Sequence, residues 1–520
     1  MSEVKSRPSA ASYSAPAANA GGERLFRRVL GVITVAVILL LGARFVWILW
    51  SQHAVTQVEA ISAIHARDLA NSGTFYYDLN SYPYTVSPYG PIWYGSLAAL
   101  YKLGLPLLTA GRVLSFVSLL GILLVTWRIL LLSTGDRYAA WTGLLFAASA
   151  ANLSGWGTLS QSDAMALFFS VMAFYQYSLD RLRPKTSTLV WCGLAIAAAI
   201  FTKQSFLAAP AAIALLLFLQ DRGRALRFVV VLGVCGTSAA LALNAWTEGR
   251  YFDNAILSNL NPFSSRNLEQ HATYLLFAGG SLVVIAASGL QRGLRGGIQP
   301  FYAYLCASLA ILLATAPKVG SDLNYQLETM LLLSWCAAWS LHHLNFFPLL
   351  FRGDRGWVTL LQIPLLLHAA VNVLGTGNSL IERYGFEELR RAETAAFRPI
   401  LNSTPGRVLS VQIDPLLQTG RQIIVEPLIY TLLVDAGVVD PGPVRRDLAA
   451  AKFDAVVLYQ DLFSGAGPPP DLDVPSLPES HLDAIRKYYR LVGHVSGPLL
   501  GGTYVYAPLK ADRRLLDAMP

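Results

Sequence analysis

Long apolar runs, separated by short polar segments, fill most of the chain between residues 29 and 375. Most of them approach the length of about 20 residues that a helix needs to cross a hydrocarbon core. The pattern predicts an all-α polytopic membrane domain with about eleven transmembrane helices. The expected spans are residues 29–50, 109–132, 138–153, 163–180, 187–202, 205–220, 228–246, 272–290, 299–316, 327–345 and 357–375.

The segment between the first two spans, residues 51–108, is expected to form a large outer loop within a transmembrane domain of residues 24–375. Part of this loop is apolar but opens with Pro-Tyr-Gly-Pro. It predicts a helix at the membrane interface, with Trp93, Tyr94 and Tyr101 in an aromatic belt. Residues 1–23 are rich in Ala, Ser, Pro and Gly, which predicts a disordered cytoplasmic tail.

The last part of the chain, residues 376–520, lacks the long apolar runs. Short β-rich segments alternate there with helical patterns, which predicts a small soluble α/β domain. The expected strands are residues 407–412, 422–425, 453–459 and 504–506, and the expected helices are residues 443–452 and 480–489.

Composition supports a membrane protein, because 54% of the residues are hydrophobic and only 14% are charged. Soluble domains carry roughly 25% charged residues. The net charge of +8 is not accompanied by a cluster of Lys and Arg on one polar arm, so it does not predict a nucleic-acid partner. The four cysteines lie inside apolar runs and predict core residues, not a zinc site or disulfides.

The distribution of Lys and Arg predicts the orientation, because cytoplasmic loops are enriched in these residues. With the N-terminus in the cytoplasm, every expected inner loop carries at least two of them. An odd number of spans then places the C-terminal domain on the extracytoplasmic side. The inner groups are Arg24/Arg27/Arg28, Arg128/Arg137, Arg181/Arg183/Lys185, Arg222/Arg224/Arg227, Arg292/Arg295 and Arg352/Arg355.

Ionisable residues near membrane depth are candidates for function, because burying them costs free energy. Glu59 lies just after the first span, at the expected membrane boundary. It is either a solvated loop carboxylate or a general base, for which a boundary of low dielectric is well suited. Asp163, at the start of a span, is either a helix cap or a ligand contact.

Lysines near the outer ends of the spans also have either a structural or a functional interpretation. Lys203, followed by Gln204, joins two apolar runs and either reaches the interface or meets an anion in a cavity. Asn324 and Glu328 are four residues apart, so they share one face of a helix. Solvation alone does not explain Glu328 at the start of a span. Lys102, Arg112 and Lys318 add further cations on the outer side.

Several motifs of soluble enzymes and pumps are missing: the sequence has no Walker motif, no H-E-x-x-H and no G-x-S-x-G. The motifs that are present resemble those of the GT-C class of polytopic membrane glycosyltransferases, especially the bacterial branch related to the protein-mannosyltransferase and aminoarabinose-transferase families. The resemblance covers roughly residues 28–375. Its motifs are residues 58–76, 82–91, 162–167 with 201–204, and 318–328.

The resemblance implies transfer of a sugar from a polyprenyl-phosphate donor to a glycan, lipid or protein acceptor outside the cytoplasm, with inversion. The acid that opens the first outer loop acts as base in that family, a role that falls to Glu59. Many relatives have an acidic pair here, and Val58 replaces the first acid, so a divalent cation is possible but not required. The expected substrate-binding residues are Tyr84, Arg112, Asp163, Lys203, Gln204, Lys318, Asn324 and Glu328.

A bacterial inner membrane is the location that the resemblance favours. Two alternatives remain open at this point: a transporter or flippase of lipid-linked glycans, and a non-catalytic assembly scaffold. Transporters often contain inverted repeats, and no such repeat is apparent. The loop of residues 51–108 and the C-terminal domain also have no obvious role in transport.

Overall fold

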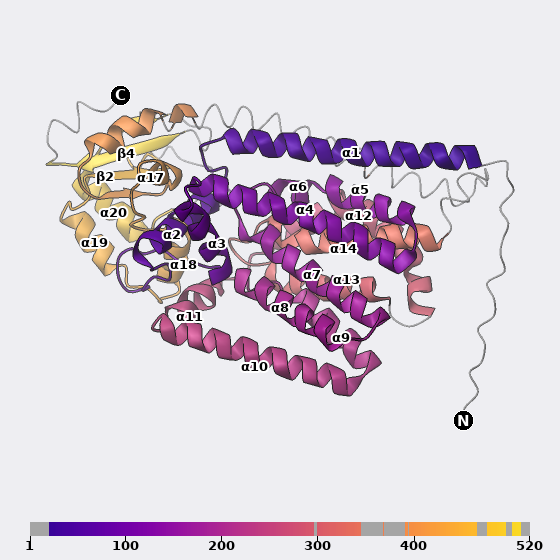
Figure 1. Cartoon of the computed structure of the whole chain (residues 1–520). Helices are drawn as coiled ribbons and strands as arrows, with labels where there is room; N and C mark the ends of the chain where they lie inside the picture. The colour runs from indigo at the N-terminus through magenta and orange to yellow at the C-terminus, as the bar shows by residue number, and fades with distance from the viewer. Residues whose placement is uncertain are drawn as a thin grey trace.

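A computed structural model of the chain describes residues 20–295, 299–344, 368, 391–393, 395–464, 476–495 and 502–510. Most of the described chain forms a helical bundle, with a small sheet domain at one end (Figure 1). The bundle helices are α1 (Ala20–Trp50), α4 (Leu107–Thr134), α5 (Arg137–Ser149), α6 (Ala151–Trp156), α7 (Ser162–Leu182), α8 (Thr186–Thr202), α9 (Ala208–Gln220), α10 (Arg222–Trp246), α12 (Ser265–Arg295), α13 (Pro300–Thr315) and α14 (Leu327–His343).

These helices overlap ten of the eleven expected spans. The eleventh, residues 357–375, lies almost wholly outside the described residues. Among the helices that the structure describes, four are long and apolar enough to cross a membrane, in α1, α4, α10 and α12, and the apolar helices α8, α9 and α13 are shorter. The membrane fold is therefore supported, whereas the count of eleven spans stays a prediction.

Helix α14 lies at the centre of the bundle. Every residue from Leu327 to Leu341 is buried, as expected for a helix that is apolar on all sides. Its Trp335 contacts Phe174 of α7 and Tyr304 of α13 through their rings. The start of this rigid central helix positions Glu328, whose surroundings are described below.

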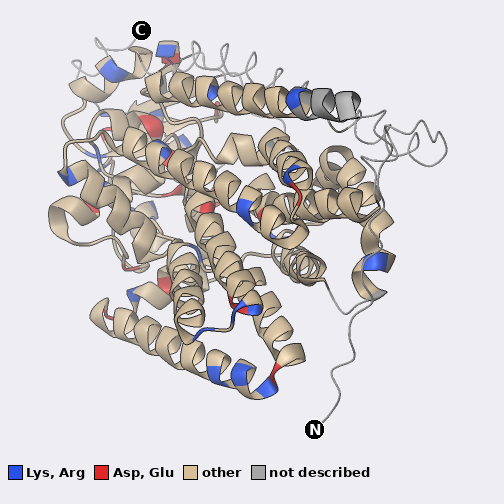
Figure 2. Ribbon diagram, turned by 45° about the vertical axis from the view of Figure 1, so that its right-hand side comes forward, with Lys and Arg blue, Asp and Glu red and all other residues tan. Residues whose placement is uncertain are grey.

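Charged side chains gather near the ends of the long helices, and α10 is uncharged along most of its length (Figure 2). Helix α7 ends and helix α10 begins at the end of the bundle opposite the sheet domain (Figure 1), and Asp180 near the end of α7 pairs there with Arg224 near the start of α10. The N-terminal end of α1 lies at that same end (Figure 1). This arrangement agrees with the predicted alternation of basic loops, and the side on which the cytoplasm lies stays a prediction.

The outer loop forms two helices, α2 (Gln57–Ser72) and α3 (Pro91–Lys102). Helix α3 was expected at the membrane interface with its aromatic residues in a belt. The structure instead buries Trp93 and Tyr94 completely. They pack in a core with Phe75 of the outer loop and Phe397 of the C-terminal region. The aromatic-belt prediction is wrong for these two residues, because a folded domain covers the helix.

The described part of the C-terminal domain contains one sheet with the strand order β1-β2-β4-β3. Strand β1 pairs parallel to β2, and β4 pairs antiparallel to both β2 and β3. The elements are β1 (Val408–Ser410), α17 (Asp414–Gln418), α18 (Pro427–Asp435), α19 (Gly442–Ala449), β2 (Ala455–Leu458), α20 (Glu479–Tyr488), β3 (Tyr489–Val495) and β4 (Thr503–Pro508).

Most elements of this domain match the expected ones, with two exceptions. Residues 422–425 form no strand, and Val425 makes only a single parallel bridge to Tyr84 of the outer loop. Strand β3 was not expected, because its sequence alternates only weakly between apolar and polar residues. It begins directly where helix α20 ends.

The outer loop and the C-terminal domain lie together at one end of the bundle (Figure 1). Gln57 donates a hydrogen bond to the hydroxyl of Tyr459 at 3.0 Å, and the backbone N–H of Ala54 donates to Asp414 at 2.9 Å. The loop and the domain therefore form one polar cap over the bundle.

Candidate active site

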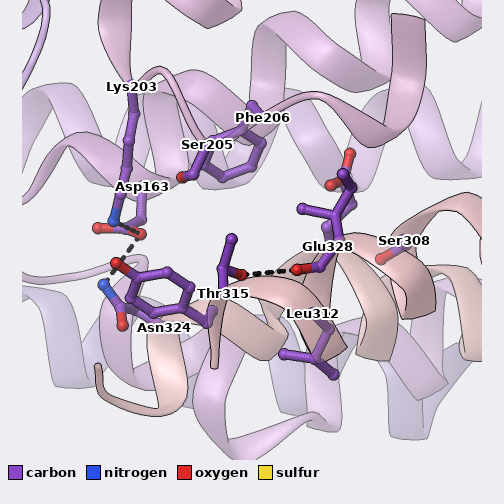
Figure 3. A pocket seen from close by; sticks show the side chains of 11 residues that line it. Asp163, Lys203, Ser205, Phe206, Ser308, Leu312, Thr315, Asn324 and Glu328 are labelled. Atoms are coloured by element: carbon purple, nitrogen blue, oxygen red, sulfur yellow. Dashed lines mark hydrogen bonds and ion pairs between the residues drawn. The ribbon is translucent and has the colours of Figure 1, made fainter. Parts of the chain in front are cut away.

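Four of the residues singled out in the sequence line one small pocket: Asp163, Lys203, Asn324 and Glu328. Three of them point toward one another (Figure 3). Lys203 Nζ lies 2.6 Å from Asp163 Oδ1, and Asn324 Nδ2 donates to the same oxygen at 3.1 Å. The fold thus brings together three segments that are distant in the sequence.

The local structure of α7 decides between the two interpretations of Asp163. The residue that caps this helix is Gln161, and no side chain forms a cap hydrogen bond there. Asp163 belongs to the first turn, and its carboxylate binds Lys203 and Asn324. Asp163 therefore does not cap α7, and its contact with a ligand stays a prediction.

Lys203 ends helix α8 in an extended conformation and is only 5% exposed. Its ammonium group lies 5.3 Å from the ring centre of Tyr89 and 5.1 Å from that of Tyr325. Burial acts to lower the pKa of Lys203, but the negative charge of Asp163 reverses this effect, so the net shift is upward. The lysine is a buried, fixed cation and does not extend to the interface.

Two buried oxygens in this pocket accept no hydrogen bond within the described part of the chain. They are Asp163 Oδ2 and Asn324 Oδ1. Leaving a buried acceptor without a donor costs about 1–3 kcal/mol. Such oxygens are well suited to accept hydrogen bonds from the hydroxyl groups of a ligand.

Glu328, the second residue of α14, is buried in the same pocket. Its Oε1 accepts a hydrogen bond from the hydroxyl of Tyr304 at 2.5 Å. Within the described residues no cation pairs with it, and its Oε2 accepts no hydrogen bond. One carboxylate oxygen is thus free for a ligand.

Lys318 lies beside this group but does not line the pocket. Its ammonium is 5.7 Å from the ring centre of Tyr325, the ring that Lys203 also faces. It donates to the backbone oxygen of Asn259 at 3.3 Å and is half-buried. The ammonium groups of the two lysines therefore lie near the same aromatic ring.

Gln204 connects the outer loop to the end of α8 through its side-chain amide, and its part in substrate binding stays a prediction. Its amide donates to the backbone oxygens of Pro88 and Ala255 at 2.8 and 2.6 Å. This ties the outer loop to the end of α8, and the backbone N–H of Gly90 also donates to Thr202 there. A Cβ on Gly90 would lie 1.9 Å from the oxygen of Phe201, so this close approach requires glycine.

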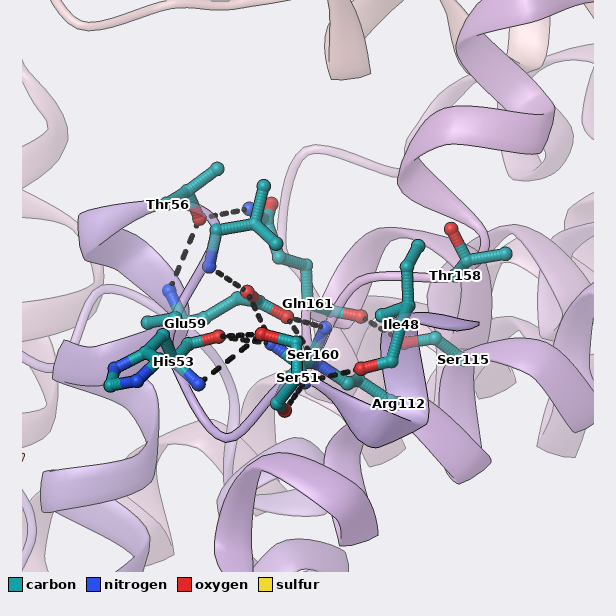
Figure 4. A network of polar contacts seen from close by, with 12 residues as sticks. Ile48, Ser51, His53, Thr56, Glu59, Arg112, Ser115, Thr158, Ser160 and Gln161 are labelled. Atoms are coloured by element: carbon teal, nitrogen blue, oxygen red, sulfur yellow. Dashed lines mark hydrogen bonds and ion pairs between the residues drawn. The ribbon is translucent and has the colours of Figure 1, made fainter. Parts of the chain in front are cut away.

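Glu59 and Arg112 form a separate, fully buried ion pair (Figure 4). Glu59 Oε1 accepts from Arg112 Nε at 3.2 Å and from the backbone N–H of Ser160 at 2.5 Å. Its Oε2 accepts from Arg112 Nη2 at 3.3 Å and from the N–H of Val55 at 2.7 Å. Both oxygens of the predicted base are thus occupied by protein groups.

The guanidinium of Arg112 is equally committed. Besides Glu59, it donates to the backbone oxygens of Ile48 and Ser51 at 2.7 and 2.6 Å, and to that of His53 at 2.7 Å. It fastens the end of α1 to α2 and α4. Arg112 was expected to bind substrate, but these contacts leave it no donor that points into the pocket.

Tyr84 was also expected to bind substrate, and the structure places it between the outer loop and the C-terminal domain. Its backbone N–H donates to the backbone oxygen of Ile424 at 2.9 Å, and its backbone oxygen accepts from the backbone N–H of Glu426 at 2.8 Å. Its ring contacts Tyr82 and Tyr430. It therefore joins two structural units and does not line the pocket.

Three tyrosines of the site were not among the residues selected from the sequence. Tyr89 and Tyr325 lie inside two of the quoted motifs, so a search for aromatic neighbours of each lysine would have found them. Tyr304 lies in the middle of an expected span, and no sequence signal separates it from the other aromatic core residues.

A divalent cation was left possible by the sequence. Within the described residues, no three His, Cys, Asp or Glu side chains lie together in a way that would hold a metal ion. The ammonium of Lys203 also occupies the side of Asp163 that a cation would approach. These residues do not fit a divalent metal.

Comparison with solved structures shows which folds this chain resembles. ArnT from Cupriavidus metallidurans, in the apo state, superposes with a TM-score of 0.61 at 14% identity, covering 94% of this chain and 98% of that one. ArnT bound to undecaprenyl phosphate gives the same TM-score, covering 91% and 99%. This chain has the ArnT fold.

The apo oligosaccharyltransferase of Archaeoglobus fulgidus also superposes, with a TM-score of 0.55 at 14% identity, covering 92% of this chain and 75% of that one. The GT-C resemblance inferred from the motifs thus holds for the fold, across both the bundle and the C-terminal domain of the ArnT-like chain. No protein-family model matches the sequence. No curated protein matches it either.

Proposed function

We propose that this ArnT-like chain is a membrane glycosyltransferase of the GT-C class that takes its sugar from a polyprenyl-phosphate-linked donor. The observation that carries the proposal is the pocket in which Asp163, Lys203, Asn324 and Glu328 meet. It combines a fixed cation, free carboxylate oxygens and aromatic rings at the polar end of a membrane bundle. One solved ArnT complex contains undecaprenyl phosphate, and one AglB complex contains dolichol phosphate, which supports a lipid-phosphate donor.

The proposed reaction is a single displacement at the anomeric carbon of the donor sugar. The oxygen of an acceptor hydroxyl forms the new bond to that carbon. The bond from the carbon to the phosphate oxygen breaks, and its electron pair leaves with the lipid phosphate. The acceptor proton passes to a protein carboxylate. Attack from the opposite face inverts the anomeric centre.

The leaving phosphate is proposed to lie near Lys203, with Lys318 as a second cation beyond Tyr325. A preorganised positive charge at the place where negative charge develops stabilises the transition state. Lys203 suits this role because Asp163 and two tyrosine rings hold it in place before the donor arrives. The phosphate is a stable anion when it leaves, so no general acid is needed.

The sequence and the geometry favour different residues as the general base. Glu59 is the predicted base, yet its two oxygens accept four hydrogen bonds from the protein. A base must reach the proton that it accepts, directly or through one water. We propose that Glu328 takes the proton, because its Oε2 is free and it lines the pocket. Protonating Asp163 would instead leave Lys203 buried without its partner.

The acceptor is proposed to approach from the cap formed by the outer loop and the C-terminal domain, which lies outside the cytoplasm if the predicted orientation holds. The bacterial inner membrane stays the proposed location. A glycan, lipid or protein acceptor suits this arrangement equally, because the described pocket contains no feature that distinguishes among them.

The experiment that tests the function is sugar transfer by the full chain reconstituted in liposomes. A panel of polyprenyl-phosphate sugars with radiolabelled sugar is offered together with an extract of inner-membrane glycans and lipids. Transfer of label supports the proposal. Movement of the intact labelled lipid between leaflets without transfer would identify a flippase instead.

A further inference from the structure

An open groove runs between α8 and α10, on a side of the bundle that the proposed active site does not use. Its volume is about 650 Å³, and its walls are mostly aliphatic and aromatic side chains. Thr186 and Leu189 of α8 face Arg224 and Phe228 of α10 at one end, and Phe201 lies at the other. Helices α8 and α10 begin at the same end of the bundle, so the groove follows both.

Helix α10 packs only loosely against the rest of the chain. Ala225 is the one buried residue of this helix, all of which the structure describes. Val231 and Cys235 line the groove and are exposed. Gly193 and Gly236 open it further, because both lack a side chain and no atom lies within 4 Å of a Cβ built on Gly236.

One end of the groove is basic, whereas its walls are mostly apolar. Arg224 and Arg227 line this end, and Arg222, Arg183 and Lys185 are close in sequence. The acidic residues near them in sequence are Asp180, close to the end of α7, and Asp221, directly before α10. Asp180 pairs with Arg224 at 2.7 Å, and Asp221 caps α10. Arg227 makes a weaker contact, 3.3 Å from its Nε to the oxygen of Gly223.

We propose that this groove is a binding site for a phospholipid with an anionic headgroup. The headgroup phosphate lies at Arg224 and Arg227, and one acyl chain lies along α8 toward Phe201. Fifteen residues of helix separate Thr186 from Phe201, about 22 Å at 1.5 Å per residue. One leaflet is about half of a hydrocarbon core of roughly 30 Å, so the groove is long enough for the chain of a lipid from that leaflet.

Charge complementarity distinguishes this lipid from the donor. The basic residues lie at the end of the bundle opposite the cap and its pocket, which is the cytoplasmic end in the predicted orientation. Anionic lipids of a cytoplasmic leaflet are attracted to such basic segments. The donor phosphate is instead proposed to lie near Lys203, beyond the other end of the groove. The inference therefore does not depend on transferase activity.

The test uses the purified full chain and native mass spectrometry, with phosphatidylglycerol and phosphatidylcholine of identical chains offered at equal concentration. Phosphatidylglycerol is expected to bind preferentially. Arg227→Gln should reduce this binding roughly fivefold, the usual value of one basic residue at a membrane surface. Arg227→Lys keeps the charge and should retain most of the preference.

A pair of glycine substitutions tests whether the groove holds the acyl chain. Gly236→Leu should abolish binding of both lipids, because the new side chain occupies the space of the acyl chain. Gly233→Leu adds the same side chain to the same helix at a position that does not line the groove and is equally open. It should bind like the original chain, which separates filling of the groove from damage to the helix.

Three results would overturn the inference. They are equal binding of the two phospholipids, unchanged preference in Arg227→Gln, and unchanged binding in Gly236→Leu. Undecaprenyl phosphate is included as a competitor. If it displaces phosphatidylglycerol while Arg227→Gln leaves its own binding intact, the groove holds the donor chain and the proposed lipid site is wrong.

Discussion

The ammonium of Lys203 lies 2.6 Å from a carboxylate oxygen of Asp163, so the end of α8 is locked to the first turn of α7. Removing one member of a buried ion pair usually costs about 3–5 kcal/mol, because the other charge stays buried without a partner. The pair is therefore expected to affect both the stability of the bundle and the binding of donor, and the two effects must be separated.

Lys203→Met should weaken binding of a polyprenyl-phosphate sugar and also lower the melting temperature. The double variant Lys203→Met with Asp163→Asn removes both charges, so it should regain much of the stability without regaining donor binding. Lys102→Met is the control, because Lys102 is an exposed cation at the end of α3 and does not line the pocket. Donor titration with thermal melting measures both quantities. Normal donor binding by the single variant would show that the cation is only structural.

Gly90→Ala should strongly reduce transfer. Its Cβ would lie 1.9 Å from the oxygen of Phe201, so the loop must move away from the end of α8 that carries Lys203. Gly95→Ala adds the same methyl group on α3, where no atom lies within 4 Å, and should be nearly neutral. Comparing the turnover of the two variants checks this. Equal activities would mean that the contact does not position Lys203.

Glu426 is expected to make the stability of the cap depend on pH. Burial raises its pKa from 4.5 to about 7, although the N–H of Val86 and the hydroxyl of Thr85 act against this shift. The folded protein thus favours the protonated form. Glu426 therefore contributes most to the stability of the folded protein below pH 4.5. This contribution decreases as the pH rises, and above about pH 7 the buried carboxylate destabilises the fold by its full amount.

Glu426→Gln should therefore stabilise the protein most above pH 7 and change little below pH 4.5. The comparison is made with the unaltered chain at each pH, because His65 acts in the opposite sense. Burial lowers the pKa of His65 to about 3, so its folded form loses stability relative to the unfolded chain as the pH falls below 6.5. Melting curves from pH 4 to 8 measure the difference, and a difference independent of pH would exclude the assignment.

The predicted orientation is tested by a cysteine placed at Ser464, an exposed residue of the C-terminal domain. A thiol reagent that does not cross membranes should label it in intact cells whose outer barrier has been opened. Cys235 and Cys306, both exposed in the structure, are replaced by Ala to lower the background. Labelling only after the inner membrane is disrupted would place the domain in the cytoplasm and contradict the odd number of spans.

Four of the eight residues expected to bind substrate line one pocket, and there is a physical reason for this. Asp163, Lys203, Asn324 and Glu328 are polar groups beside apolar runs, and such groups must find partners when the runs are buried. The same argument selected Glu59 and Arg112, but these two satisfy each other and the surrounding backbone. Whether a buried charge meets a ligand or another charge depends on packing between distant segments, and sequence spacing does not contain that information.

The fold, too, was predicted correctly where it depends on local sequence and missed where it depends on packing between distant segments. Helices at the expected spans are recovered because each apolar run specifies its own element. The burial of Trp93 and Tyr94 was missed, because it depends on a domain that begins some three hundred residues later in the chain. The role of Tyr304 was missed as well, since only its contact with Glu328 distinguishes it from a core tyrosine.

The central claim is that the pocket around Lys203 and Glu328 transfers a sugar from a lipid phosphate, and the turnover of two matched variants tests it most directly. In the liposome assay, Glu328→Gln should lower turnover by about two to four powers of ten, the usual contribution of a general base, with donor affinity almost unchanged. Glu59→Gln should lower the melting temperature, because Arg112 loses its counter-charge, while the folded fraction keeps its turnover. Full activity of Glu328→Gln, together with loss of turnover in stably folded Glu59→Gln, would contradict the account.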